Sequence, residues 1–169
     1  MNMDIIKELK EHNIIQYGTF TLSSGIESSI YIDMKKVISF PKLNKAICLE
    51  LINKINDNTH LVCGAPYGAV SYASIISVLG DIPMIFLRKE TKKYGTKKLI
   101  EGNYNKGDKV VLIEDVVTTG NSVIEAANML EEQGLIISQI IAVVSRVSKD
   151  LYYKDIKIES LFLGDTMVE

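Results

Sequence analysis

The stretch KVVLIEDVVTTGNS (residues 109–122) decides the fold of this chain of 169 residues. Its first part, 109–113, places four aliphatic side chains directly after Lys109, which predicts a buried strand. The carboxylates of Glu114 and Asp115 follow, and a short loop of small residues then leads into a helix predicted over 122–133. A strand that passes directly into a helix in this way is the repeating unit of a parallel α/β sheet.

The same alternation continues on both sides of this stretch, from about residue 60 to the end of the chain. Strands are predicted over 61–63, 83–87, 137–145 and 156–163, and a helix is predicted over 69–79. Strands that alternate with helices form parallel sheets with right-handed crossovers. We therefore expect the α/β fold class, with a central, mostly parallel sheet flanked by helices, in a single domain over residues 1–169.

The first 40 residues follow another pattern. Residues 3–12 place aliphatic side chains at helical spacing among charges, which predicts a short amphipathic helix. Two β-rich runs, 18–22 and 29–33, surround a glycine turn and predict a hairpin. Because Pro41 then starts a new helix, we expect residues 1–40 to form a small N-terminal hood on the main body.

Composition excludes several classes of protein. The net charge of −2 argues against a nucleic-acid binder. Cys48 and Cys63 lie in apolar runs without CxxC spacing, which indicates buried, reduced thiols in a cytoplasmic protein. His12 and His60 are isolated, so no zinc-type cluster is visible. No apolar run approaches the roughly 20 residues of a membrane span, and charges near the N-terminus interrupt any signal-peptide core, so we expect no membrane partner.

The loop after the decisive strand has the composition of an anion site. A helix N-terminus presents unpaired backbone N–H groups, Thr118, Thr119 and Ser122 add hydroxyl donors, and Gly120 allows close approach. The acids before the loop would repel a bare phosphate, so they are better suited to sugar hydroxyls or to a hydrated Mg²⁺. The alternative is an ordinary helix capped by Thr or Ser, with incidental acids. The spacing does not match a Walker loop.

A second polar segment is strongly basic. Residues 88–98 carry six cations and one acid, and residues 88–106 show no sustained apolar period, so we predict a long mobile loop there. A compact anion such as pyrophosphate would suit this charge. A solvated charge run is the alternative. Nucleic acid is a third reading, although Tyr94 is the single aromatic residue among these cations.

Residues 110–122 resemble the signature of the type I phosphoribosyltransferases, which bind phosphoribosyl pyrophosphate. The basic loop, RKETKKYGTKKLIEG (residues 88–102), resembles the catalytic loop of the orotate phosphoribosyltransferases, and most closely the type that is fused to a decarboxylase in animals. The likeness extends through FTLSSG (20–25), SSIYID (28–33) and VCGAPY (62–67), so it covers most of residues 15–146. It implies the type I phosphoribosyltransferase fold.

The resemblance also implies roles for individual residues. Phosphoribosyl pyrophosphate would be bound by Tyr67, Gly68, Arg88, Lys89, Lys92, Tyr94, Glu114, Asp115, Val116, Val117, Thr118, Thr119, Gly120, Asn121 and Ser122. Orotate would be bound by Ser23, Tyr31, Ile32, Thr118 and Arg146. An Arg suits a carboxylate, although an Arg at a strand end, taken alone, is more often a surface charge than a ligand contact. The catalytic residues would be Arg88, Lys92 and Asp115.

The implied reaction joins orotate to ribose 5-phosphate and releases pyrophosphate, as a step of pyrimidine (UMP) biosynthesis. Mg²⁺ would be the cofactor, held mainly by substrate and water near Glu114 and Asp115. The basic loop would close over the site as a lid and reach the neighbouring subunit's site in a homodimer with shared active sites. The phosphate loop would wrap the 5′-phosphate while the two acids contact the ribose hydroxyls.

The sequence also departs from the commoner bacterial pattern. Ser23 and Gly68 stand where a Lys is frequent, Ser145 replaces an Asp, and Val147-Ser148 replaces a glycine pair. Three other readings therefore stay open: a transferase for another base such as a purine, a catalytically weakened homologue, and a nucleotide-sensing regulator that binds RNA or DNA. The net charge and the lack of spare length argue against the regulator.

Overall fold

The computed structural model of the chain describes residues 4–21, 25, 27–88 and 98–164. The main body is a seven-stranded sheet in the order β5-β4-β3-β6-β7-β9-β8. Its strands are β3 (Leu61–Gly64), β4 (Met84–Leu87), β5 (Ile100–Glu101), β6 (Lys109–Val117), β7 (Ile136–Ser145), β8 (Tyr152–Tyr153) and β9 (Ile156–Leu163). The strands from β4 to β9 in this order run parallel, and the two edge strands β5 and β8 are antiparallel. The predicted α/β class with a mostly parallel sheet is confirmed.

The central strand is β6, and its position follows from its apolar sequence. Val110, Val111, Leu112 and Ile113 are fully buried because β6 lies between β3 and β7, with helices on both faces. Parallel strands that are covered on both faces are typically continuous apolar runs rather than alternating ones. The strand continues to Val117, beyond the predicted end at residue 113, so both acids lie within it.

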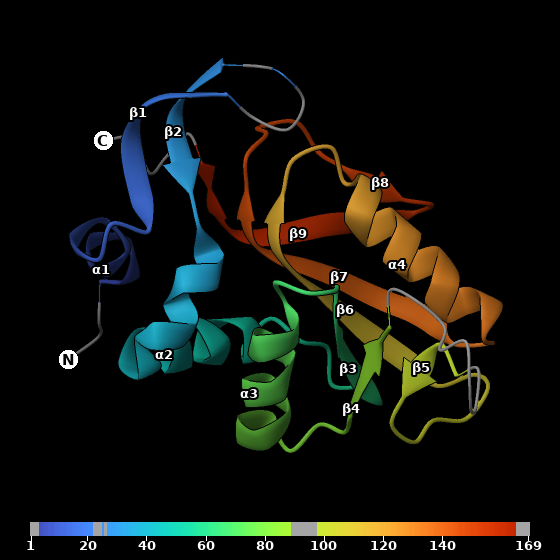
Figure 1. The fold of residues 1–169 in the computed structure, drawn as a ribbon. Coiled ribbons are helices and arrows are strands. Elements are labelled where there is room, and N and C mark those ends of the chain that lie inside the picture. The colour runs from blue at the N-terminus through green and yellow to red at the C-terminus, as the bar shows by residue number, and fades with distance from the viewer. Residues whose placement is uncertain (1–3, 22–24, 26, 89–97, 165–169) are drawn as a thin grey trace.

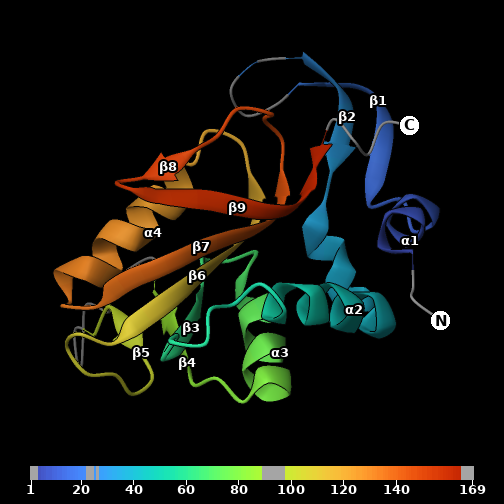
Figure 2. The same ribbon diagram turned by 180° about the vertical axis from the view of Figure 1, so that it is seen from behind.

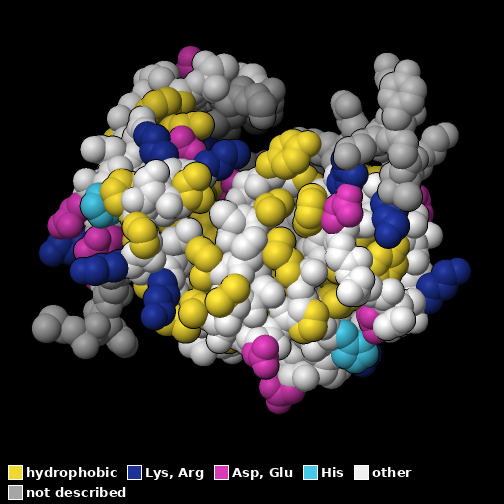
Figure 3. All heavy atoms as spheres, turned by 60° about the horizontal axis from the view of Figure 1, so that its bottom comes forward, with side chains coloured by type: hydrophobic (Ala, Val, Ile, Leu, Met, Phe, Trp, Pro, Cys, Tyr) yellow, Lys and Arg dark blue, Asp and Glu magenta, His cyan; other side chains and the backbone are white. Residues whose placement is uncertain are grey.

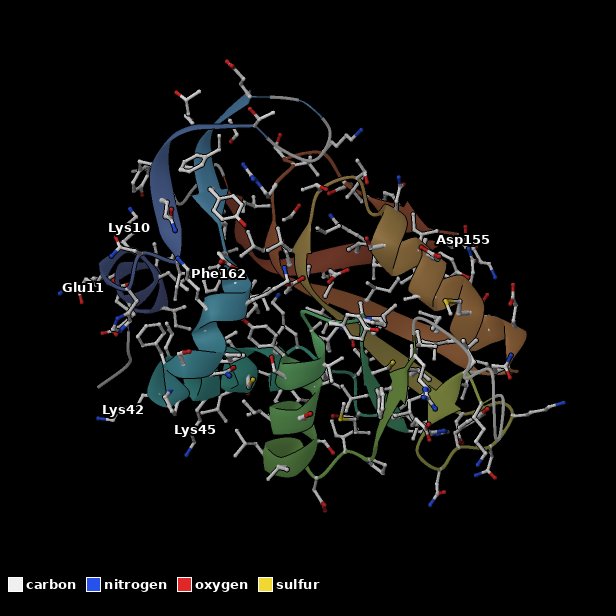
Figure 4. The ribbon with its side chains drawn as sticks, in the orientation of Figure 1. Lys10, Glu11, Lys42, Lys45, Asp155 and Phe162 are labelled. Carbon is white, nitrogen blue, oxygen red and sulfur yellow. The ribbon has the colours of Figure 1, made fainter. Side chains whose placement is uncertain are left out.

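Helices cover the two faces of the sheet, as Figures 1 and 2 show. They are α2 (Pro41–Ile52) and α3 (Val70–Gly80) on one face and α4 (Asn121–Glu132) on the other. Strand β4 shows the division, because Met84 contacts Ser74 of α3 while Leu87 faces α4. In Figure 4, Lys42 and Lys45 project outward from α2, as expected for the polar face of an amphipathic helix.

Three short elements were not predicted: the 3₁₀ helix η1 (Met34–Ser39), β5 and β8. The prediction of an unstructured loop over all of 88–106 is wrong at its C-terminal end, where β5 pairs with β4 and Arg88 N donates to Leu99 O over 2.9 Å. A strand of two residues is too short to leave a period in the sequence. Residues 89–97 of this loop lie outside the described part of the chain.

The N-terminal segment forms its own small unit beside the main sheet. After α1 (Ile5–Glu11), strands β1 (Ile15–Thr21) and β2 (Glu27–Ile32) pair antiparallel in a separate two-stranded sheet. In Figure 1 this hairpin lies above the end of the main sheet where β6 turns into α4. It is joined to the body through η1, where the buried Tyr72 hydroxyl of α3 donates to Met34 O over 2.8 Å. Among the described residues, no helix is long and apolar enough to cross a membrane.

Candidate functional site

The site lies where the carboxyl ends of β3, β6 and β7 meet the hairpin. Ala65 N donates to Ile113 O and Arg146 N donates to Val117 O, both over 2.8 Å, so the loops that leave the three strands are held side by side. Ligands of open parallel sheets bind at this edge, because the loops diverge there and leave room between them. The segments expected to bind phosphate, pyrophosphate and base are therefore brought together.

The acid pair Glu114 and Asp115 lies at the centre of this edge. The two side chains are buried, with residue exposures of 6% and 8%. Asp115 Oδ1 accepts from Val116 N over 2.9 Å, and Glu114 Oε1 accepts from Asp115 N over 3.0 Å. Burial, a hydrogen bond with Asp115 and the charge of Asp115 raise the pKa of Glu114 to about 8. A buried acid pair with so few cationic partners is poorly suited to a bare phosphate and well suited to accept from hydroxyl groups.

The turn between β6 and α4 presents an open helix N-terminus. Gly120 has φ +85°, a left-handed conformation that favours glycine, and α4 begins at the next residue. No side chain caps this helix and its first turn carries no acid, while Thr118, Thr119 and Ser122 are exposed around it. Its free N–H groups and its dipole can hold an anion.

Two residues of the predicted phosphate loop have a structural task. Val117 is buried at 3% exposure, and Val116 packs partly buried against the core. These side chains anchor the strand end in the core, so contact with a phosphate would come from their backbone groups. Asn121 is exposed, and its N–H is directed at Thr119 Oγ1 at the long distance of 3.4 Å.

The loop after β3 approaches the acid pair closely. A Cβ atom at Gly68 would lie 2.1 Å from Asp115 Oδ2, so any side chain at this position would require the Asp115 carboxylate to move. Tyr67, in the same loop, is 67% exposed beside it. The sequence marks this loop only by resemblance, and the close approach to Asp115 is a property of the tertiary structure.

The side of the site that the resemblance predicts to bind the base is formed by the end of β7 and the hairpin. Arg146 Nη2 donates to Ser28 Oγ over 2.7 Å and to Ile30 O over 2.9 Å. Tyr31 is 41% exposed, whereas Ile32 is 7% exposed and faces the opposite side of β2. Of these two neighbours, Tyr31 can offer its ring to a base, and Ile32 could offer only backbone atoms.

Arg88 is described at the start of the basic loop. Its Nη1 donates to Glu101 Oε1 over 2.7 Å, and the residue lines a hollow together with Pro66 and Ser122. This hollow places Arg88 beside the N-terminus of α4. The predicted contacts of Ser23, Lys89, Lys92 and Tyr94 lie outside the described residues.

Two residues of the site were missed by the sequence argument. Lys35 Nζ lies 3.7 Å from Asp115 Oδ2, and Ser28 is the side-chain partner of Arg146. Neither residue belongs to a spacing pattern with a known chemical meaning. Their partners are 80 and 118 positions away along the chain, so the contacts depend on the fold.

Comparison with known proteins identifies the relatives of this chain. A sequence profile of the phosphoribosyl transferase domain matches residues 41–162. Orotate phosphoribosyltransferase of Methanosphaera stadtmanae is 43% identical over 143 residues, 84% of this chain and 80% of that protein. Uridine 5′-monophosphate synthase of Bos taurus is 38% identical over 146 residues, which are 84% of this chain and 30% of that protein. The likeness is therefore not particular to the fused type.

The fold also matches solved structures. Orotate phosphoribosyltransferase from Aeropyrum pernix superimposes with a TM-score of 0.82 at 26% identity, covering 97% of this chain and 96% of that one. Leishmania donovani UMP synthase gives a TM-score of 0.82 at 30% identity, covering 97% of this chain and 36% of that one.

Proposed function

The chain belongs to the phosphoribosyl transferase family, and we propose that it transfers ribose 5-phosphate from phosphoribosyl pyrophosphate to orotate, a step of pyrimidine biosynthesis. The observation that carries this proposal is the strand-loop-helix from β6 to α4, which places a buried acid pair directly before an open helix N-terminus. A ribose 5-phosphate offers both hydroxyl donors for the acids and an anion for the helix N-terminus within one ligand. The reduced thiols inferred for Cys48 and Cys63 suit the cytoplasm.

Different residues act on different parts of the substrate. Glu114 and Asp115 accept hydrogen bonds from the ribose hydroxyls, and the first turn of α4 holds the 5′-phosphate. The bond from C1′ to pyrophosphate breaks, a bond from C1′ to a ring nitrogen of orotate forms, and that nitrogen releases its proton to water. Negative charge grows on the departing pyrophosphate, so cations fixed beside it stabilise the transition state more than the ground state. Arg88 and the basic loop that follows it would supply part of this charge.

The base is selected at the other end of the acid pair. Arg146 presents a guanidinium whose planar fork matches the carboxylate of orotate, and Tyr31 of β2 presents an exposed ring. Uracil lacks that carboxylate, and a purine is larger. This arrangement supports orotate over the other bases that the family can use.

We also propose Mg²⁺ as the cofactor. Among the described residues, no group of three or more His, Cys, Asp or Glu side chains could form a complete metal site. The oxygens of Glu114 and Asp115 are hard ligands that fit Mg²⁺ or its water shell, so most of its ligands would come from substrate and water. When bound, Mg²⁺ would neutralise charge on the pyrophosphate.

The proposed homodimer is supported by an apolar surface on the face of the molecule that carries α3. Val78 of α3 is 82% exposed, and Phe86 of β4 is 40% exposed beyond Ser74 and Met84. Figure 3 shows hydrophobic side chains gathered over the middle of the face that carries α3. Exposed apolar patches of this kind mark protein interfaces. The mass in solution, measured by light scattering, should be that of a dimer, and Val78→Glu should convert it to a monomer. A monomeric wild type would refute this assembly.

One assay tests the activity. The protein is incubated with phosphoribosyl pyrophosphate, Mg²⁺ and orotate, and the loss of orotate absorbance is followed. Asp115→Asn should reduce turnover at least about 100-fold, whereas Asp155→Asn, at the exposed β8–β9 turn labelled in Figure 4, should behave as wild type. Turnover with uracil or a purine and none with orotate would refute the choice of base. No turnover with any base would favour the regulator or the weakened homologue.

A further inference from the structure

The fold places the cation Lys35 beside the acid pair, and no sequence motif predicts this contact. Its Nζ lies 3.7 Å from Asp115 Oδ2. In the part of the chain that the structure describes, no other ion pair involves Asp115 or Glu114. Lys35 is therefore the described side chain that brings positive charge to the centre of the site.

The backbone that carries Lys35 is fixed, while its head group is not. On one side of it, Met34 is buried and its carbonyl accepts from the Tyr72 hydroxyl over 2.8 Å. On the other side, Val37 is fully buried. The side chain of Lys35 is nevertheless 72% exposed, so its ammonium group can change position while the backbone stays anchored by the buried neighbours.

The ammonium lies close to the loop after β3. A Cβ at Gly68 would be 2.1 Å from Asp115 Oδ2, and Lys35 Nζ is 3.7 Å from the same oxygen, so Nζ is at most 5.8 Å from that Cβ position. A side chain at Gly68 would therefore displace the Asp115 carboxylate. The loop after β3 has no cation at Gly68, and Lys35 of η1 brings a positive charge close to the same position.

The pair between Lys35 and Asp115 is weakly held. A separation of 3.7 Å exceeds the usual hydrogen-bond range, and the lysine end of the pair is exposed to water, which screens the attraction. A pyrophosphate carries more negative charge than a carboxylate and would take the ammonium readily. We propose that Lys35 binds the pyrophosphate group of the substrate and leaves Asp115 to accept from the ribose hydroxyls. This inference rests on the proposed function, because it takes phosphoribosyl pyrophosphate as the ligand.

The test compares two ligands that differ only in the pyrophosphate. Affinities for phosphoribosyl pyrophosphate with Mg²⁺ and for ribose 5-phosphate are measured by calorimetry in Lys35→Gln, Lys35→Arg and Lys36→Gln. Lys36 is the matched control, since it lies on the same short helix and its Nζ is directed at Asn13 O, 3.5 Å away. Lys35→Gln should weaken the pyrophosphate ligand about tenfold and ribose 5-phosphate less than about twofold. Lys35→Arg should recover most of the loss, and Lys36→Gln should match wild type.

Two results would overturn the inference. Unchanged affinity for phosphoribosyl pyrophosphate in Lys35→Gln would show that the lysine does not contact it. Equal losses for both ligands would show that the lysine acts through Asp115 on the ribose. Because the comparison needs no base, it stands even if the protein binds phosphoribosyl pyrophosphate and transfers to a base other than orotate. A wild type that binds no phosphoribosyl pyrophosphate would overturn this inference together with the proposed function.

Discussion

Replacing Ser28 with Ala should weaken orotate use about tenfold, although the residue lies on the hairpin and in no catalytic motif. The Ser28 hydroxyl accepts from Arg146 Nη2 over 2.7 Å and donates to Ile30 O over 2.8 Å. Hydrogen bonds to charged groups contribute about 1.5–3 kcal/mol. Ile30 O, 2.9 Å from the same Nη2, would still hold the guanidinium. We therefore take the lower end, about 1.5 kcal/mol, which corresponds to roughly a factor of ten.

The assay is kcat/KM for orotate at saturating phosphoribosyl pyrophosphate. The KM for phosphoribosyl pyrophosphate should stay within about twofold of wild type, because Ser28 lies on the base side of the site. Ser29→Ala is the matched control, since Ser29 is the exposed neighbour on β2. Its kinetics should equal those of wild type, and thermal unfolding should show that both variants are folded.

A double-mutant cycle shows whether Ser28 acts through Arg146. In an Arg146→Met background, Ser28→Ala should cause little further loss, because the group that it orients has been removed. The reasoning would be refuted by equal orotate kinetics in Ser28→Ala and Ser29→Ala. It would also be refuted if Ser28→Ala cost the full factor of ten without the arginine.

Three further predictions concern buried groups. Glu114→Gln should weaken phosphoribosyl pyrophosphate binding but stabilise the fold at pH 8. The pKa of Glu114 rises from 4.5 to about 8 on folding, so ionisation destabilises the folded state as the pH rises through this range, by up to about 1.4 kcal/mol per pH unit. Denaturant unfolding should show that the gain in the free energy of unfolding of Glu114→Gln over wild type is smaller at pH 5 than at pH 8. An equal gain at both pH values would contradict this prediction. Burial raises the pKa values of Cys48 and Cys63 to about 12, so both thiols should resist a thiol reagent at pH 8 until the chain unfolds. The free energy of unfolding should also fall above about pH 9, because only the thiols of the unfolded chain ionise there. Labelling of the folded protein would refute their burial. Gly68→Ala should displace Asp115 and weaken phosphoribosyl pyrophosphate binding by about 1–3 kcal/mol. Gly80→Ala is the control, because a Cβ there would meet its nearest atoms at 3.5 Å, and its affinity should equal that of wild type. Calorimetry compares the two variants, and equal affinities would contradict the close approach of Gly68 to Asp115.

Much of the architecture was predictable because local patterns decide it. The aliphatic run of β6 can only be buried, and its passage through Thr-Thr-Gly into α4 requires a parallel neighbour on either side. The errors are of a different kind. β5 and β8 have two residues each and are strands only because β4 and β9 offer free edges for pairing. The end of β6 was predicted too early, since the charges of Glu114 and Asp115 look like a strand end when their burial is unknown.

The candidate site divides in the same way. The phosphate loop and the acid pair lie within nine consecutive residues, so the residues alone indicated an anion site beside acids that suit sugar hydroxyls or a hydrated Mg²⁺. The assignments to orotate and to the basic loop came from resemblance, and the roles of single residues there stay predictions. The contacts of Arg146 and Lys35 join segments that are far apart along the chain.

The sequence by itself thus determined the parallel core of the sheet, its central strand and the turn predicted to bind an anion, because periodicity, helix termini and side-chain chemistry act over a few residues. Only the tertiary structure decided that Gly68 approaches Asp115, that Lys35 supplies a cation there and that Ser28 holds Arg146. These contacts depend on how β3, β6, β7 and the hairpin pack against one another. A contact between distant segments leaves no local pattern in the sequence, because neither of its two residues is unusual for its own segment. The fold alone brings the two residues within a few ångströms.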